Sequence, residues 1–209
     1  MKKFLLMIIL LIGAVCIHCR QPESCDIAIG QNSYKLYEKN NYLYGKIGMK
    51  PYKIADEKII DYAIYDIDND GNEEILALTY GGDEVYVRDF IIYGTEKAEE
   101  KITAKEIYRQ DFSEIKPWKV EACNLDNDGE ADIFIGVHKD TIFYKDVRNR
   151  PFFYSWDGER LNKKWLGSFF SDWDLEDIAF GDYYNLGYDL AAVLEKRDDG
   201  YRVGIYKFV

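Results

Sequence analysis

The sequence predicts an all-β, β-propeller-like fold with about three and a half four-stranded blades, which would make a partial or small propeller. Two observations lead to this prediction. A short acidic loop recurs after 58 residues, each time between apolar segments. The segments around both copies are rich in Tyr, Phe, Ile and Val, the residue types that suit a pleated, half-buried surface. A repeat of roughly 50 to 60 residues with about four strands is typical of propeller blades.

The residues at the amino terminus indicate export. Lys2 and Lys3 precede an apolar run from Phe4 to Val15, the pattern of a signal sequence. We assign residues 1–19 to a signal peptide or to a lipoprotein signal or anchor, because Cys16 or Cys19 could instead carry a lipid. The expected location is secreted or in the cell envelope of a bacterium. Any membrane contact is expected only through this N-terminal segment or its lipid.

The rest of the chain is divided by its repeats. Residues 20–31 are interpreted as a linker and residues 32–209 as the propeller domain. The expected repeats are about 32–58, 59–116, 117–173 and 174–209, the first being the later half of a unit. Segment Thr95 to Tyr108 is the best helical candidate, although it could equally belong to strands. Asp157-Gly158 and Asp199-Gly200 predict hairpin turns.

The two acidic loops have the spacing of a metal site. The first is Asp66-Ile-Asp-Asn-Asp-Gly-Asn-Glu-Glu74 and the second is Asn124-Leu-Asp-Asn-Asp-Gly-Glu-Ala-Asp132. Positions one, three, five and nine carry side-chain oxygens, and position six is a glycine where the backbone must turn. Ca²⁺ is the expected ion, because it accepts about six to eight oxygen ligands in a flexible shell. The simpler interpretation is that Asp, Asn and Gly only make turns between strands.

The predicted side-chain ligands fall into two sets, one for each of two calcium sites. They are Asp66, Asp68, Asp70 and Glu74 in the first loop, and Asn124, Asp126, Asp128 and Asp132 in the second. In a third copy of the repeat, Gly181, Tyr183 and Leu186 are expected to replace the first ligand, the third ligand and the glycine, so that loop is not expected to bind metal. Neither metal loop is an EF-hand, because position twelve is Ala77 or Ile135 where an EF-hand has a glutamate.

This loop pattern, DxDxDGxx[DE] between strands at a spacing of about sixty residues, resembles the FG-GAP and VCBS blades of integrin-like propellers. The resemblance covers roughly residues 32 to 209. It implies a β-propeller in which each intact loop holds one calcium ion on the rim between blade strands. It also implies two further ligands, the main-chain carbonyls of Asn72 and Glu130. The Phe-Gly and Gly-Ala-Pro sequences that give the family its name are not recognisable here.

Charge and cysteine content narrow the possible partners. The formal charge is −11, and removing residues 1–19, with two lysines and no acid, makes it −13. Nucleic acid is therefore not an expected partner, because binding it depends on basic side chains. Cys25 and Cys123 are the cysteines clearly outside the signal segment. Cys123 is interpreted as a buried strand residue, with a disulfide to Cys25 as the alternative.

The residues favour binding over catalysis. His138 is the single histidine after the signal segment, and no nucleophile, zinc or phosphate-loop motif is complete. The four tryptophans are assigned mainly to blade packing, with sugar stacking as the alternative. We therefore predict a non-enzymatic module that binds a protein or glycan and has structural calcium. A hydrolase built on a propeller scaffold and a purely structural envelope component are the competing hypotheses.

Overall fold

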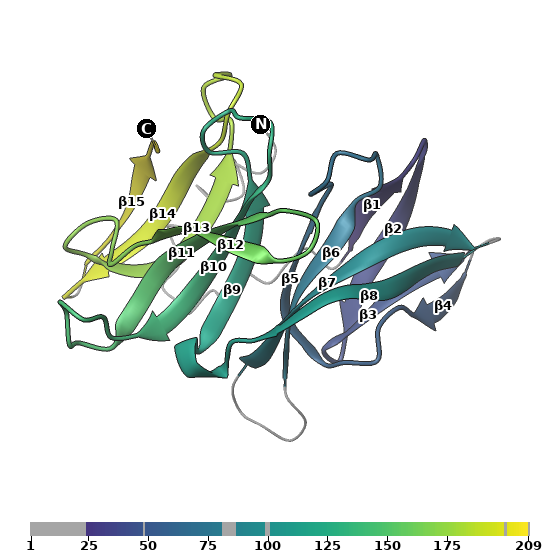
Figure 1. Ribbon diagram of the computed structural model, residues 1–209, viewed down its shortest axis with the longest axis horizontal. Helices are drawn as coiled ribbons and strands as arrows, with labels where there is room; N and C mark the ends of the chain where they lie inside the picture. The colour runs from purple at the N-terminus through teal and green to yellow at the C-terminus, as the bar shows by residue number, and fades with distance from the viewer. Residues whose placement is uncertain (1–23, 48, 81–86, 99–100, 199, 209) are drawn as a thin grey trace.

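The computed structural model describes residues 24–47, 49–80, 87–98, 101–198 and 200–208. In this part of the chain, strands form four small antiparallel sheets arranged as the blades of a four-bladed propeller (Figure 1). The predicted all-β, propeller-like fold is confirmed. The predicted signal or anchor over residues 1–19 lies outside the described residues. Among the residues described, no helix has the length and apolar character needed to cross a membrane.

Each sheet is a meander in which strands pair in chain order. The first sheet contains β1 (Cys25–Ile29), β2 (Asn32–Lys39), β3 (Tyr42–Ile47) and β4 (Lys50–Lys53). The second contains β5 (Ile59–Tyr65), β6 (Glu74–Tyr80), β7 (Val87–Ala98) and β8 (Lys101–Asp111). After the short 3-10 helix η2 (Ser113–Ile115), the third contains β9 (Pro117–Cys123), β10 (Asp132–Lys139), β11 (Arg148–Trp156) and β12 (Leu161–Leu166). The fourth has three strands, β13 (Asp174–Gly181), β14 (Leu190–Arg197) and β15 (Gly200–Tyr206).

The first blade is more complete than the sequence suggests. The expected linker over residues 20–31 contains β1, which pairs antiparallel with β2 across a tight turn at Gly30. Ile27 and Ile29 alternate into the core, the normal behaviour of a half-buried strand. The expected half-blade at the amino terminus is therefore a full four-stranded sheet, and the incomplete sheet is the fourth. No sheet contains strands from both ends of the described chain.

Two local alternatives are resolved by strand pairing. Segment Thr95 to Tyr108 belongs to β7 and β8, which pair with each other, and contains no helix among its described residues. Ile102 of β8 packs into the core of the first two sheets. The turn at Asp157-Gly158 joins β11 and β12 as predicted. For the second predicted turn, Asp199 lies outside the described residues, and Arg197 pairs with Gly200 across it.

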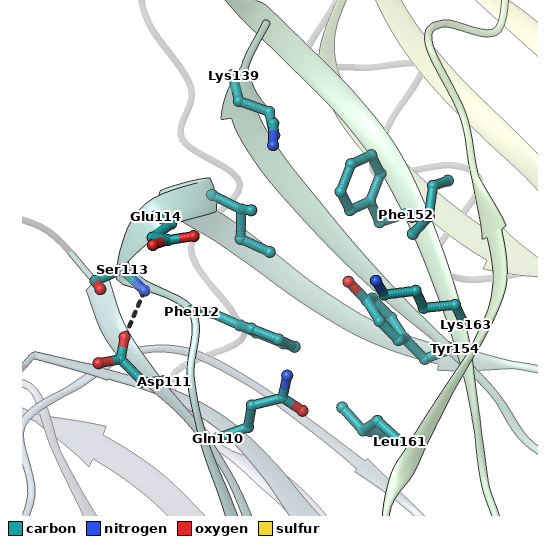
Figure 2. Close-up of a pocket in the computed structure, with 12 residues that line it drawn as sticks. Gln110, Asp111, Phe112, Ser113, Glu114, Lys139, Phe152, Tyr154, Leu161 and Lys163 are labelled. Carbon is teal, nitrogen blue, oxygen red and sulfur yellow. Dashed lines mark hydrogen bonds between the residues drawn. The ribbon is translucent and has the colours of Figure 1, made fainter. Parts of the chain in front are cut away.

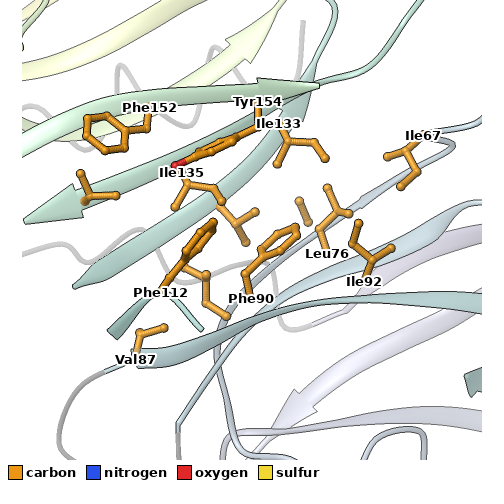
Figure 3. Packing of buried hydrophobic residues seen from close by; sticks show 14 of the residues in the cluster. Ile67, Leu76, Val87, Phe90, Ile92, Phe112, Ile133, Ile135, Phe152 and Tyr154 are labelled. Carbon is orange, nitrogen blue, oxygen red and sulfur yellow. The ribbon is translucent and has the colours of Figure 1, made fainter. Parts of the chain in front are cut away.

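Apolar side chains are buried between consecutive sheets. The largest cluster lies between the second and third sheets, where Phe90 and Leu76 face Ile133 and Ile135 (Figure 3). Two other clusters join the first sheet to the second and the third to the fourth. Burying one such side chain stabilises the fold by about 1.5 to 3 kcal/mol. Among the described residues, none of these clusters joins the fourth sheet to the first.

Cys123 and two of the tryptophans pack against neighbouring side chains. Cys123 is fully buried in β9, its Sγ donates to the carbonyl of Asp132 at 3.6 Å, and both Cys123 and Cys25 are free thiols. The buried-strand interpretation is thus confirmed, and the alternative disulfide is not formed. Trp165 stacks on Phe153 with ring centroids 5.7 Å apart, and Trp156 meets Tyr108 edge to face at 5.0 Å.

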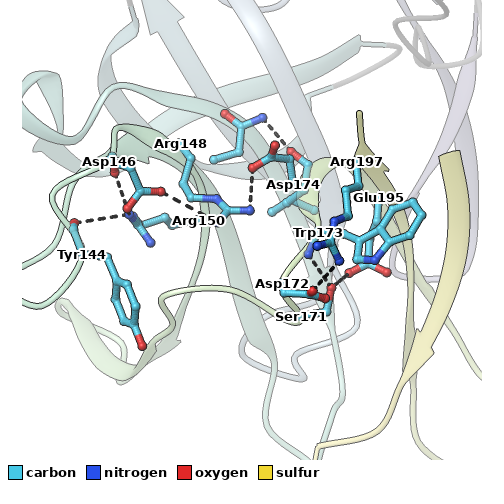
Figure 4. Close-up of polar contacts among 12 residues, drawn as sticks. Tyr144, Asp146, Arg148, Arg150, Ser171, Asp172, Trp173, Asp174, Glu195 and Arg197 are labelled. Atoms are coloured by element: carbon cyan, nitrogen blue, oxygen red, sulfur yellow. Dashed lines mark hydrogen bonds and ion pairs between the residues drawn. The ribbon is translucent and has the colours of Figure 1, made fainter. Parts of the chain in front are cut away.

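A buried arginine holds the loop between β10 and β11. The side chain of Arg150 is fully buried and donates to the carbonyls of Lys139 at 2.7 Å, Ser168 at 2.8 Å and Asp146 at 2.7 Å (Figure 4). Satisfying a buried guanidinium with backbone carbonyls removes most of the cost of burying its charge. The loop is thereby fixed, although its tip exposes large apolar side chains, Ile142 and Phe143, at 83% and 87% of their surface.

Candidate metal centre

The acidic loops lie where the first strand of a sheet turns into the second. All three copies have the same backbone frame. Position four is an asparagine in the left-handed region, with φ of 59° at Asn69, 58° at Asn127 and 57° at Asn185. Position six is a glycine with φ of 88°, 84° and 85° in the same order. Asn and Gly are the residues that adopt positive φ at least cost.

The third loop keeps this frame, contrary to the sequence alignment. Gly181 pairs with Leu190 in the fourth sheet, as Tyr65 pairs with Glu74 in the second. Position one of the third loop is therefore Asp182 and not Gly181, and position six is Gly187 and not Leu186. The sequence alignment of the third loop is therefore wrong by one residue, and the loop that it treated as lost is present. Positions three, five and nine become Tyr184, Leu186 and Leu190, so the third loop still lacks three of the four side-chain ligands.

The first loop brings three of its predicted ligands together. One carboxylate oxygen from each of Asp66, Asp68 and Glu74 lies within 4.8 Å of the others. Asp66 also fixes the turn, because its two oxygens accept from the main-chain N–H groups of Asp70 at 3.0 Å and Gly71 at 2.9 Å. Glu74 is buried and accepts from the N–H of Ile67 at 3.0 Å.

The electrostatics of the first loop are unfavourable without a cation. The pKa of Glu74 is raised from 4.5 to about 7, chiefly by burial; the hydrogen bond from Ile67 opposes the rise and the charges of Asp68, Asp70 and Asp66 add to it. Among the described residues, no Lys, Arg or His forms an ion pair with these four carboxylates. Carboxylates gathered in this way repel one another unless a positive charge lies between them.

The geometry of this cluster fits calcium. Two oxygens bound to one Ca²⁺ at about 2.3 to 2.6 Å can lie up to roughly 5 Å apart, and the observed limit of 4.8 Å is within that distance. Asp70 and Asn72 also contact each other. An oxygen of Asp70 accepts from both the N–H and the side-chain amide of Asn72, at 2.7 and 2.9 Å, so this carboxylate orders the turn.

The second loop has a lysine among its predicted ligands. The Nζ of Lys164, on β12, lies 2.8 Å from Asp126, 3.4 Å from Asp128 and 2.6 Å from Asp132. Burial lowers the pKa of Lys164, but the pairs with Asp126 and Asp132 outweigh this and raise it above its usual value. Asn124 accepts from the N–H of Asn127 at 2.9 Å, which closes the turn.

The remaining predicted ligand is Glu130, through its carbonyl. Its N–H donates to Asp128 at 2.8 Å. This contact repeats the one between Asn72 and Asp70 in the first loop, so positions five and seven have the same relation in both loops.

Sequence reasoning missed the residues that connect the loops. In the first loop, the N–H of Glu73 donates to the carbonyl of Ala28 at 2.9 Å, and its carboxylate accepts from the N–H of Ala28. Asp189 makes the same two contacts with Asn124, at 2.6 and 2.9 Å. Both acids occupy position eight. The sequence could have indicated this role, because position eight is acidic in two of the three loops.

The first and second loops also contact each other directly. The side-chain amide of Asn69 donates to the carbonyl of Gly129 at 3.0 Å. The N–H of Gly30, in the β1–β2 turn, donates to the carbonyl of Gly71 at 3.0 Å. The three loops and this turn therefore form one hydrogen-bonded series across one end of the four sheets.

A groove of about 580 Å³ lies near η2, between the second and third sheets (Figure 2). Its wall includes Phe112, Phe152 and Tyr154, with Lys139 and Lys163 beside them. The carboxylates in this wall are Asp111 and Glu114. Hydrogen bonding to Ser113 lowers the pKa of Asp111, which favours an ionised carboxylate over a general acid.

A comparison with models of known protein families finds no match, and a search of curated proteins finds no similar protein.

Proposed function

We propose that this chain is an exported or envelope-anchored, calcium-binding propeller module of the FG-GAP and VCBS type, which binds a protein or glycan and does not act as an enzyme. The observation that supports calcium most directly is the first loop. There, oxygens of Asp66, Asp68 and Glu74 lie within 4.8 Å of one another, with Glu74 buried. The repeated backbone frame of the loops and their place between blade strands support the resemblance on which the family assignment rests.

Calcium in this loop would act on more than one blade. The loop is bonded to β1 through Glu73 and to the second loop through Asn69. An ion that draws the carboxylates together would fix these neighbours as well, because the same short segment holds both the ligands and the connecting groups. The role of the metal is therefore structural, and it holds one end of the propeller in a defined shape.

One surface feature supports binding, and the surroundings of His138 give no support to catalysis. The loop tip at Ile142 and Phe143 is strongly exposed, yet Arg150 fixes the loop that carries it. Exposed apolar side chains on an ordered loop are typical of contact surfaces. The side chain of His138 contacts Asn149 at 2.9 Å, an arrangement that an ordinary strand residue adopts without a catalytic role.

Calcium binding is tested by thermal melts and calorimetry on metal-free protein. At roughly 2 mM calcium, and with a dissociation constant of about 0.1 mM as in tighter extracellular sites, one site stabilises the fold by about 1.8 kcal/mol. Asp68→Asn should remove most of this shift, and the matched control Asp182→Asn, in the third loop, should keep it. An unchanged melting midpoint on adding calcium to the wild type would refute the proposal.

Binding as opposed to catalysis is tested on the same preparation. A pull-down and a glycan array, each with and without calcium, should show calcium-dependent capture of one partner. A broad hydrolase panel runs beside them, and turnover abolished by changing one carboxylate outside the loops would favour the enzyme hypothesis. Export is tested by mass spectrometry of the native amino terminus, which should begin near residues 16 to 20; full-length protein in the cytosol would contradict it.

A further inference from the structure

The second loop is already neutralised by the chain itself. The ammonium of Lys164 lies 2.6 to 3.4 Å from three carboxylates, those of Asp126, Asp128 and Asp132. These are loop positions three, five and nine, the side chains that the spacing assigns to a cation. The side chain of Asp132 is fully buried, so removing its partner would leave an uncompensated buried acid.

A β-bulge aims Lys164 at the loop. Along β11 and β12, Phe153 pairs with Trp165 and Tyr154 pairs with Lys163, so Lys164 is the unpaired extra residue. A bulge of this kind redirects the side chain it carries. Lys164 can therefore reach over the neighbouring strands to the loop that precedes β10.

The second sheet has the same bulge without the charge. Along β7 and β8, Ile92 pairs with Tyr108 and Tyr93 pairs with Glu106, which leaves Ile107 unpaired. The two bulges are at equivalent places, because Tyr93 pairs with Ile75 and Tyr154 pairs with Ile133, the residues directly after Glu74 and Asp132.

The residue at the bulge thus differs in charge between the two blades: it is a cationic lysine in the third sheet and an uncharged isoleucine in the second. The carboxylates of the first loop have no ion-pair partner among the described residues, and Ile107 carries no charge that could neutralise them.

We propose that Lys164 is a built-in replacement for the metal of the second loop, and that the residue at this outer-strand bulge decides whether a loop takes calcium. The ammonium supplies the positive charge that the carboxylates need, and it occupies the space that the ion would use. The second loop is therefore independent of calcium, and the protein has one calcium site instead of the two that the loop spacing predicts.

The test exchanges the two bulge residues. Calcium titrations by calorimetry, on the mature protein after removal of the signal segment, should give one site in the wild type. Lys164→Ile should give two, with a new site of roughly 0.1 to 1 mM affinity. Ile107→Lys should lose the first site. Without calcium, Lys164→Ile should melt at a lower temperature than the wild type. Adding calcium should raise its melting temperature back to that of the wild type.

The expected stoichiometry of the wild type rests on the proposed function, whereas the gain in Lys164→Ile does not. If the wild type binds no calcium and Lys164→Ile binds one, the role of Lys164 stands and the calcium site of the first loop falls. Folded Lys164→Ile that gains no site overturns the role of Lys164.

Asp126→Asn in the wild-type background decides the matter if Lys164→Ile does not fold. Unchanged calcium stoichiometry agrees with a lysine-filled second loop. A lost site shows that calcium displaces the lysine and overturns the proposal.

Discussion

The first and third loops have the same backbone and different side chains. In each, the aspartate at position one accepts from the N–H groups of positions five and six, at 3.0 and 2.9 Å for Asp66 and at 2.6 and 2.8 Å for Asp182. Only the first loop adds acids at positions three, five and nine. The third loop forms this turn with one acid, an asparagine and a glycine, so the further acids of the first loop are not required for the turn, and we propose that they hold a cation.

The largest expected difference between these loops is in the pH dependence of metal-free protein. The folded-state pKa of Glu74 is raised from 4.5 to about 7. The folded state thus holds this proton more tightly, and the resulting stability is present below about pH 4.5 and is lost as pH rises through about 7. A shift of this size corresponds to at most about 3 kcal/mol, and solvent screening of the exposed neighbours reduces the expectation to about 2 kcal/mol.

Urea unfolding with a chelator between pH 4 and pH 8 measures this loss, and Glu74→Gln should reduce it; Asp61, whose pKa burial also raises to about 7, accounts for the part that remains. The third loop should behave in the opposite way. Hydrogen bonds from Leu186 and Gly187 lower the pKa of Asp182, so its contribution is lost as pH falls through the lowered pKa. A profile that Glu74→Gln leaves unchanged would show that Glu74 is not the group that titrates.

Glycine substitutions should break both loops to a similar extent. At Gly71 and Gly187, φ is 88° and 85°, and an added Cβ would meet no atom within 4 Å. The cost of alanine is therefore conformational alone, about 1 to 2 kcal/mol at each position. Denaturant unfolding with a chelator should give equal losses for Gly71→Ala and Gly187→Ala. With calcium, only Gly71→Ala should also weaken metal binding; a calcium effect of Gly187→Ala would contradict the comparison.

Alanine at position one should have the smallest effect on stability. Which of the two variants, Asp66→Ala or Asp182→Ala, loses more stability should reverse when calcium is added. Asp182→Ala loses two hydrogen bonds to main-chain N–H groups, so it should lower the stability by less than the glycine substitutions. Asp66→Ala loses the same two bonds but relieves repulsion with Asp68 and Glu74, so in chelator it should cost less. With calcium, Asp66→Ala should cost more, because a ligand is lost. Unfolding curves of both variants in the two conditions check this reversal.

The sequence predicted the elements that depend on neighbouring residues. The acidic loops, the strand-rich repeats and the turn at Gly158 follow from local spacing and turn chemistry, and all are found. The first loop also gathers Asp66, Asp68 and Glu74 as its spacing indicates. Strand β1 was missed because Gly30 makes a short turn there without the acidic loop that marks the other sheets.

The errors concern relations that span the chain. Lys164 follows Asp126 by 38 residues, and only the bulge in β12 brings the two together. The register of the third loop was misplaced by one residue because similarity was judged without strand pairing, which fixes Gly181 opposite Leu190. Position-eight acids such as Glu73 look like ordinary surface charges until their partner strand is known.

The arrangement of the buried clusters determines how the domain comes apart. Among the described residues, apolar clusters join only consecutive sheets, so the first and fourth sheets each have one apolar neighbour and the inner two have two. Unfolding of such an array is governed by nearest-neighbour coupling, and an end unit can open while the rest persists. The three-stranded fourth sheet is held to the third by its cluster and by Asp189, whereas the first sheet is held to the second by its cluster and to the first acidic loop by Glu73. If the first loop binds calcium as proposed, the ion would set an order of opening along the chain, with the carboxyl-terminal blade released before the amino-terminal one.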